Sequence, residues 1–265
     1  MNTYSCFKGR GRIALALRSA FLAKTAGLIA VGNASMLDLN ISEKSEDVPD
    51  YTTSAGGNDC NVRLIEKVEF DLSMSHWTPE NIARATLGTG TADNVATAVV
   101  ASEPHVAHPG AIVPLDNVPD LSVVIVVKSV DDLTTYTAGT DYTVTESGSI
   151  EILAGTTIPA PTITAGVGQP NIHVGYTSVT HSVIQLLTNK SQDYVLHFDG
   201  VNLVTGNPAQ FDLFNVRLSP GKKLSALGDT VGRIDVTGSV QRDLSKPVGS
   251  VGNPLSQYGT IKLTA

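Results

Sequence analysis

The chain has 265 residues and a formal net charge of −7, and charged residues make up only 16% of it. Soluble domains usually contain about 25% charged residues. Two explanations fit this deficit: part of the surface is buried against other subunits, or Ser and Thr supply the polarity. An acidic chain lacks the basic surface of a protein that reads a nucleic-acid sequence, although an acidic wall can surround DNA without adhering to it.

Neither export nor membrane anchoring is expected from the N-terminal region. Arg10 and Arg12 precede an apolar run, but Ile13–Leu17 spans only five residues before Arg18. That run is too short for a signal-peptide core or a membrane span. Cys6 and Cys60 form one possible pair and predict no disulfide framework. We expect both to be free thiols in a reducing cytoplasm.

Strand patterns dominate the N-terminal part of the chain. Large apolar residues alternate with alanines over 13–17 and with polar residues over 37–41. Over 68–75 the alternation separates an apolar face from a polar face that holds Glu69, Asp71 and Ser73. These patterns predict strands with one buried face. Residues 42–61 are polar, lack a hydrophobic period and are expected to form a long loop.

One helix is predicted to begin at Pro79. Thr78 suits the N-cap position, Pro79 the first helical position, and Glu80 the positive end of the helix dipole. Gly88 is placed to end the helix in a left-handed conformation. Residues 89–110 are rich in Ala, Thr, Val and Pro and are predicted to form a linker.

Residues 101–172 are predicted to be a small β-rich insertion. The apolar run 121–127 predicts a buried strand, and the segments 141–145 and 149–153 are spaced as in a hairpin. Strand patterns resume after the insertion and continue to residue 264. The predicted fold class is mainly β: residues 1–100 and 173–265 form a β-sandwich or barrel with one flanking α-helix, and 101–172 form an inserted small β domain.

No motif predicts catalysis, a cofactor or a metal site. His105 and His108 lie close in sequence, but two histidines without a Cys or an acidic partner are a weak zinc signal. Gly221-Lys222-Lys223 lacks the upstream glycine of a phosphate-binding loop. Glu69 and Asp71 share a strand face, which would suit a hydrolase cleft, but a solvated strand face explains them equally well. We expect a protein that is not an enzyme.

Four segments, in this order, carry a resemblance to a known family. They are Tyr4–Leu17 with 31–35 and 37–39; Asp50-Tyr51 through Gly56-Gly57 into 62–75 and the helix 79–85; Phe211–Leu218 with 227–229 and 234–240; and Ser256-Gln257-Tyr258-Gly259. Together they resemble the phage tail tube proteins (major tail proteins). The resemblance covers residues 1–100 and 175–265, whereas 101–172 match the family less clearly.

The resemblance implies a structural virion protein with a tail tube fold. In the family, a β-sandwich with a flanking helix contributes strands to a shared inner barrel, and hexameric rings stack into a tube that conducts DNA into the host bacterium. The implied partners are further copies of the chain, the tape measure, baseplate or tail-tip and tail terminator proteins, and double-stranded DNA that passes without sequence-specific binding. Assembly would take place in the host cytoplasm, without a membrane.

Two sets of site residues follow from the resemblance and the residue patterns. In the family, long loops join one ring to the next, so the predicted loop would supply the inter-ring stacking contacts Glu46, Asp47, Asp50, Tyr51, Gly56, Gly57 and Asp59. An acidic lumen would let DNA slide, and the polar strand faces would line it with Glu69, Asp71, Ser73, Asp235 and Thr237.

Three other interpretations stay open. The segment 121–176 is also typical of the Ig-like domains of a bacterial surface or pilus-like adhesion protein, although the expected lack of an export signal argues against it. A related tube or baseplate component would show similar strand patterns. A hydrolytic β enzyme would need a catalytic motif, which we do not find in the sequence.

Overall fold

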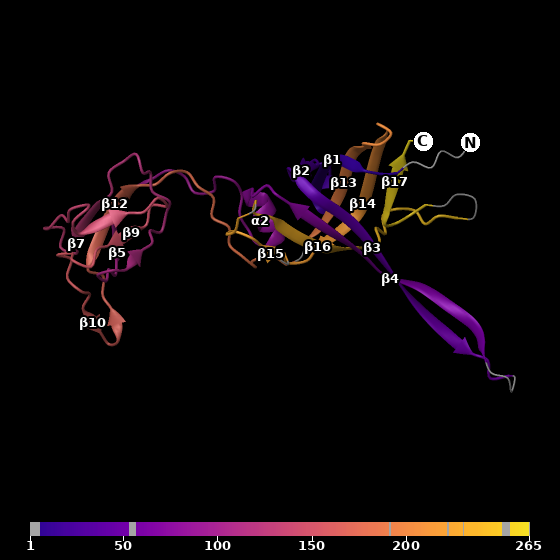
Figure 1. The fold of residues 1–265 in the computed structure, drawn as a ribbon, viewed down its shortest axis with the longest axis horizontal. Helices are drawn as coiled ribbons and strands as arrows, with labels where there is room; N and C mark the ends of the chain where they lie inside the picture. Colours follow the sequence, from indigo (N-terminus) through magenta and orange to yellow (C-terminus); the bar gives the residue numbers. More distant parts are fainter. Residues whose placement is uncertain are drawn as a thin grey trace. The chain divides into compact units, whose positions relative to one another are not determined.

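The computed structural model of the chain describes residues 6–52, 57–190, 192–221, 223–229, 231–250 and 255–264. The protein is mainly β and divides into two compact units, Met1–Gly90 with Ile184–Ala265, and Thr91–Val183 (Figure 1). The segment predicted as an insertion, 101–172, lies within the second unit. The second unit extends beyond the predicted insertion at both ends. The reason is that β5 (Val99–His105) and β12 (Ile172–Thr177), which each cross one predicted boundary, pair with each other.

The first unit is built on one nine-stranded antiparallel sheet. Its strand order is β2-β1-β13-β14-β16-β4-β3, with β15 paired to β16 and β17 paired to β14. The strands are β1 Gly9–Leu17, β2 Ile29–Ala30, β3 Ala34–Pro49, β4 Asn58–Met74, β13 Asp193–Asn202, β14 Pro208–Leu218, β15 Lys223–Leu224, β16 Ile234–Val240 and β17 Gly259–Leu263. Because β1 pairs with β13, this sheet forms only when the two ends of the chain come together.

One face of the sheet is buried, as the alternation of apolar and polar residues predicts. Phe70, Leu72 and Ile234 are each at most 1% exposed and belong to the core of the first unit. The Phe70 ring lies over Gly238, its register partner on β16, where an added Cβ would come within 2.4 Å of a ring carbon. Glycine at 238 therefore leaves the space that this phenyl ring fills.

The predicted helix is α2 (Pro79–Ala85), and its start is confirmed. The Thr78 side chain accepts a hydrogen bond from the backbone N–H of Asn81 at 3.2 Å, as expected of an N-cap. The predicted end is wrong, because Leu87 and not Gly88 is left-handed, with φ 48°. Gly88 is needed for space instead, since a Cβ there would lie 2.5 Å from a backbone oxygen.

A second, five-residue helix, α1 (Arg18–Leu22), follows β1 and was not predicted. Its N-cap residue, Leu17, makes no side-chain capping hydrogen bond, and the helix buries no residue. It therefore leaves neither a cap signal nor an apolar periodicity in the sequence. Within the described ranges, no helix combines the length and the apolar character needed to cross a membrane.

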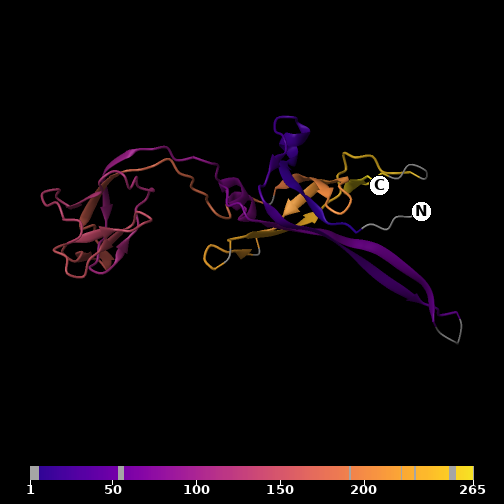
Figure 2. The same cartoon turned by 45° about the horizontal axis from the view of Figure 1, so that its top comes forward.

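The segment predicted as a loop, 42–61, is the far half of a long β-hairpin, so that prediction is wrong. β3 and β4 pair as far as Pro49 and Asn58, and the backbone N–H of Asp50 donates to the Gly57 carbonyl at 2.8 Å across the connection. Figures 1 and 2 both show this end standing clear of the other strands of the unit. The far half is exposed on both faces, so burial imposed no hydrophobic period on it.

The second unit is a small sandwich of two three-stranded sheets, ordered β5-β12-β7 and β6-β9-β8, with a separate β10-β11 hairpin. Its remaining strands are β6 Ile112–Val113, β7 Val126–Ser129, β8 Tyr142–Val144, β9 Ile150–Ile152, β10 Ile163–Thr164 and β11 Val167–Gly168. The predicted hairpin is confirmed as β8 and β9. Both sheets contribute to one core, for example through Ile150 of β9 and Val174 of β12, which are fully buried.

Two segments of the second unit differ from their predictions. Leu121 lies in an exposed turn, because the Asp120 carboxylate accepts hydrogen bonds from both the backbone N–H and the hydroxyl of Ser122, at 2.9 and 2.6 Å. The strand predicted over 121–127 starts only at Val126. The linker predicted over 89–110 contains β5, and the backbone N–H of Ser178 donates to the Ala98 carbonyl at 2.8 Å.

Asp141 joins two turns of the second unit. Its carboxylate accepts hydrogen bonds from the Thr137 N–H at 2.9 Å and from the N–H and the hydroxyl of Thr157, both at 2.8 Å. These hydrogen bonds favour the charged form and lower the pKa of Asp141 to about 2, and the bond from the Thr137 N–H has the largest effect. Because the folded-state pKa lies below the usual 3.8, the stabilisation is present at neutral pH and is lost as the pH falls from about 4 towards 2.

We expect amide hydrogen exchange over residues 150–158 to show this loss as falling protection between about pH 4 and pH 2. In Asp141→Asn the same backbone amides should already be less protected at neutral pH. Both carboxylate oxygens of Asp141 accept hydrogen bonds, whereas the Asn side chain has only one acceptor oxygen. Glu146→Gln, on an exposed turn residue, is the matched control and should behave like the wild type. Identical pH profiles for Asp141→Asn and the wild type would contradict the role of Asp141.

Candidate functional site

The five residues predicted to line a lumen lie together on one polar face of the first unit's sheet. The antiparallel register pairs Ser73 with Asp235 and Asp71 with Thr237, and Glu69 follows on the same face of β4. Ser73 Oγ donates a hydrogen bond to Asp235 Oδ1 at 2.7 Å. Glu69 is exposed, Asp71, Asp235 and Thr237 are half-buried, and Ser73 is buried. The face is thus continuous across β4 and β16, opposite the apolar core.

This polar face is acidic where it reaches β3. Asp38 of β3 lies opposite Asp71, and Asn40 Nδ2 donates to Asp71 Oδ2 at 2.8 Å. With Glu69 and Asp235, four carboxylates therefore occupy three adjacent strands. Such a cluster gives the local surface a negative potential, which repels polyanions.

Ion pairs balance the charge farther along the same face, on β13, β14 and β17. Arg217 Nη2 lies 2.7 Å from Asp193 Oδ1. The Asp212 carboxylate lies 2.5 Å from His197 Nδ1 and 2.9 Å from Lys262 Nζ. Burial raises the pKa of Asp212, but the hydrogen bonds from Lys262 and His197 outweigh it, so the pKa lies below its usual value. The acidic region is therefore confined to the β3, β4 and β16 side of the sheet.

The second candidate element is the far half of the β3–β4 hairpin. Residues 58–68 of β4 pair only with β3 among the described strands, since β16 covers β4 only from Glu69 to Met74. β3 is the last strand of the sheet, so both edges of the ribbon carry backbone groups without a strand partner in the described chain. Val48 and Tyr51 of the far half are 37% and 87% exposed, and Ile41, Leu64 and Ile65 at its base are each more than 60% exposed. Open edges with apolar side chains favour pairing with another chain.

The residues predicted for a stacking loop fall on this hairpin. Glu46 and Asp47 lie in β3 and Asp59 in β4, while Asp50 and Gly57 close the connection between the strands. Tyr51 follows Asp50 and is 87% exposed. Gly56, the remaining member, lies outside the described residues. The structure therefore gathers the described members at one end of an extended ribbon.

An open groove of about 670 Å³ lies where the hairpin leaves the sheet. It is lined on one side by residues 65–69 of β4 and on the other by residues 239–242, Leu244 and Tyr258. β16 ends at Val240 while β4 continues, which leaves the β4 edge uncovered along the groove. The groove borders the acidic face at Glu69.

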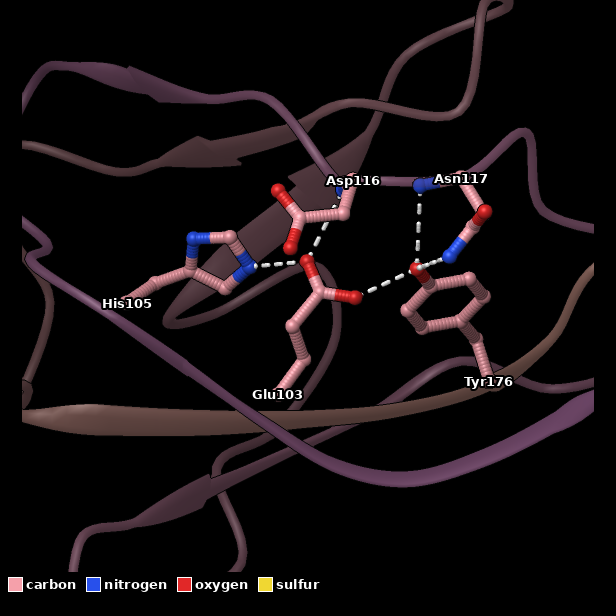
Figure 3. Close-up of polar contacts among 5 residues, drawn as sticks. All are labelled: Glu103, His105, Asp116, Asn117 and Tyr176. Atoms are coloured by element: carbon pink, nitrogen blue, oxygen red, sulfur yellow. Dashed lines mark hydrogen bonds and ion pairs between the residues drawn. The ribbon is translucent and has the colours of Figure 1, made fainter.

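A buried polar cluster in the second unit was missed from the sequence. The Glu103 carboxylate accepts hydrogen bonds from the Tyr176 hydroxyl at 2.5 Å and the Asp116 N–H at 2.9 Å, and lies 2.6 Å from His105 Nε2 (Figure 3). The Asn117 N–H donates to the Tyr176 hydroxyl at 3.2 Å. Every polar partner comes from the unit itself, so the cluster fastens the 116–117 loop to β5 and β12. The sequence feature that pointed to this cluster is the acidic residue Glu103. It occupies an inward position of β5, inside the segment 89–110 that is predicted to be a linker.

Metal binding receives no support from the histidines. His105 is held by Glu103, and the exposed His108 accepts a hydrogen bond on its backbone carbonyl from Ala111. In the part of the chain that the structure describes, no three His, Cys, Asp or Glu residues come together as a metal site. The candidate site consists of the acidic sheet face and the projecting hairpin.

These features define a mainly β protein with an antiparallel sheet, a projecting hairpin and a small inserted sandwich. A family model described as "Protein of unknown function UCP028589" matches residues 6–262, and the chain belongs to that family. The search of curated proteins found no match.

Proposed function

We propose that this chain is a structural virion protein, a phage tail tube protein that forms stacked hexameric rings and the conduit for DNA ejection. The observation that carries the proposal is the far half of the β3–β4 hairpin, a two-stranded ribbon with open edges and exposed apolar side chains. A two-stranded ribbon alone is marginally stable in water. Pairing with another copy satisfies its edges, and a repeated contact of this kind closes into a ring or continues as a tube.

The acidic face supports the second part of the proposal. In a ring of identical copies, Asp38, Glu69, Asp71 and Asp235 repeat around the axis and form a negative wall. DNA is a polyanion, so a wall of like charge keeps it from adhering while it passes. The tail tube fold, the tape measure, baseplate or tail-tip and terminator proteins as partners, and the place in the virion belong to the same proposal.

Negative-stain electron microscopy of the purified full-length protein tests the proposal. We expect six-fold rings or tubes at high protein concentration. A protein that stays monomeric at every concentration, also in the presence of a tail-tip scaffold, would refute it. The same images separate the main alternative, a surface adhesion protein, which the two-sheet sandwich of residues 91–183 also fits. That alternative predicts discrete particles.

Neutralising the acidic face should slow DNA passage and leave assembly intact. We expect Glu69→Gln with Asp71→Asn to lengthen the time of genome release severalfold, because the wall would repel DNA less. Release can be followed by a DNA-binding dye on phage carrying the variant. Glu146→Gln with Glu151→Gln, two exposed residues of the second unit, is the control. Unchanged release kinetics in particles of normal tail length would remove the acidic face from the lumen.

A further inference from the structure

One outer face of the second unit's sandwich carries a pocket. Along β12, Ile172 and Val174 point into the core, so His173, Gly175 and Thr177 point outward. An open pocket of about 300 Å³ lies on this outward side, and its lining comes from β5, β12, β7 and the segments on either side of β7. All of the lining residues belong to the unit Thr91–Val183.

Apolar side chains form the walls of this pocket. Val99 of β5 and Val124, just before β7, are 79% and 80% exposed. Gly175 lies on the central strand of the sheet, opposite Val126 in the register, and has no side chain to fill the floor. A Cβ added there would lie 2.9 Å from the Ala101 carbonyl oxygen. The exposed valines around an open floor leave room for an apolar group, whose burial there is favourable.

Two opposite charges line the same pocket. Lys128 on β7 is the register partner of His173, so both side chains stand on the outward face. Asp132 comes from the turn after β7, and its Oδ1 lies 3.3 Å from His173 Nδ1. The Asp132 side chain is 51% exposed, and the contact with His173 uses only one of its two oxygens. Among the described residues Lys128 forms no ion pair. Its ammonium group and the second Asp132 oxygen are therefore open to a ligand.

We propose that this pocket binds a free α-amino acid with an apolar side chain. The ligand carboxylate pairs with Lys128, its ammonium group pairs with Asp132, and its side chain lies over Gly175. A ligand with a single charge leaves one of the two protein charges unmatched, and an apolar ligand leaves both unmatched. In an α-amino acid both charged groups are attached to one carbon, so both can reach a pocket at the small end of the range for ligand sites.

Four probes that share parts of one structure test the class of ligand. L-phenylalanine has both charges and an apolar body, hydrocinnamate lacks the ammonium group, phenethylamine lacks the carboxylate, and L-serine lacks the apolar body. Saturation-transfer NMR on the full-length protein measures binding whether or not the chain polymerises. We expect L-phenylalanine to bind with a dissociation constant on the order of 1 mM, as a small ligand in a half-open site. Hydrocinnamate and phenethylamine should bind about three- to fivefold more weakly, as for exposed ion pairs, and L-serine should not saturate the site.

Two substitutions assign each ligand charge to its partner. Lys128→Met should weaken L-phenylalanine binding about three- to fivefold without weakening phenethylamine binding. Asp132→Asn should weaken L-phenylalanine binding by the same factor without weakening hydrocinnamate binding. Asparagine tolerates the left-handed backbone of residue 132, whose φ is 57°. The matched control is Glu151→Gln, an exposed position of β9 in the other sheet, and it should bind all probes like the wild type. Amide hydrogen exchange over residues 150–158 shows whether each variant is folded.

The results decide on this site without reference to rings or tubes. Selective losses in the two charge variants support the amino-acid site. Equal affinities for L-phenylalanine, hydrocinnamate and phenethylamine would show apolar adhesion only and overturn the proposed class of ligand. Failure of L-phenylalanine to saturate the wild type would overturn the site. Binding that weakens as the protein concentration rises would show that a second copy covers this face, and would overturn it as well. A chain that forms no tubes refutes the proposed function and leaves this site unaffected.

Discussion

Replacing residues 45–63 by Asn-Gly should abolish tube formation while leaving the sheet of the first unit folded. The replacement joins Lys44 to its register partner Leu64 through a two-residue turn, for which Asn-Gly is well suited. It removes residues 45–63 of the β3–β4 hairpin, none of which belongs to the core of the unit. Since interface energy is concentrated in few residues, we expect the concentration needed for polymerisation to rise more than about 100-fold. Electron microscopy and sedimentation measure the effect.

A matched hairpin in the second unit provides the control. Gln169 N–H donates to the Thr162 carbonyl at 2.8 Å, so replacing residues 163–168 by Asn-Gly shortens the exposed β10-β11 hairpin in the same manner. This variant should form tubes at the wild-type concentration. Normal tubes from the 45–63 replacement would refute the stacking role of the hairpin. Loss of tubes in both variants would show that the effect is not specific to it.

Phe70→Ala should cause a large loss of stability in the first unit. Phe70 is fully buried and its ring fills the space over Gly238. Removing a buried phenyl ring costs about 3–5 kcal/mol, from lost burial and from the cavity that remains. Urea unfolding followed by fluorescence measures it for the first unit alone, because the single tryptophan, Trp77, lies in that unit.

Phe21→Ala is the control for this measurement. Phe21 lies on the short helix α1 and is 36% exposed. Its removal should change the free energy of unfolding by no more than about 0.5 kcal/mol, as is usual for surface positions. If Phe70→Ala and Phe21→Ala lowered the unfolding midpoint equally, the core position of Phe70 would be contradicted.

The strands that were predicted correctly are those with one buried face. Val68, Phe70, Leu72 and Met74 alternate with polar residues because burial acts on every second position of β4. The helix start at Thr78 was predictable for a different reason: an N-cap is a local hydrogen bond between residues close in sequence. The same alternation predicted a polar face on β4 and another on β16, but not that the two strands are neighbours.

The errors occur where burial is absent or where another interaction competes. The far half of the hairpin is exposed on both faces, and an irregularity in the register between Ser42 and Glu43 interrupts the alternation. At 121–124 the Asp120 carboxylate holds the backbone in a turn against the strand preference of Val123 and Val124. Gly88 was predicted to end the helix in a left-handed conformation. The structure gives another reason for the glycine, because the nearby backbone oxygen of Gln185 leaves no space for a Cβ.

The sequence by itself determined the mainly β class, the buried face of the core strands and the start of α2, because each depends on residues that are neighbours along the chain. Only the tertiary structure decided that residues 42–61 form a ribbon with open edges, and that Glu69, Asp71, Ser73, Asp235 and Thr237 share one surface. The physical reason is that strand pairing joins residues far apart in sequence through backbone hydrogen bonds. Those bonds are the same for every side chain and leave no residue signature at the paired positions.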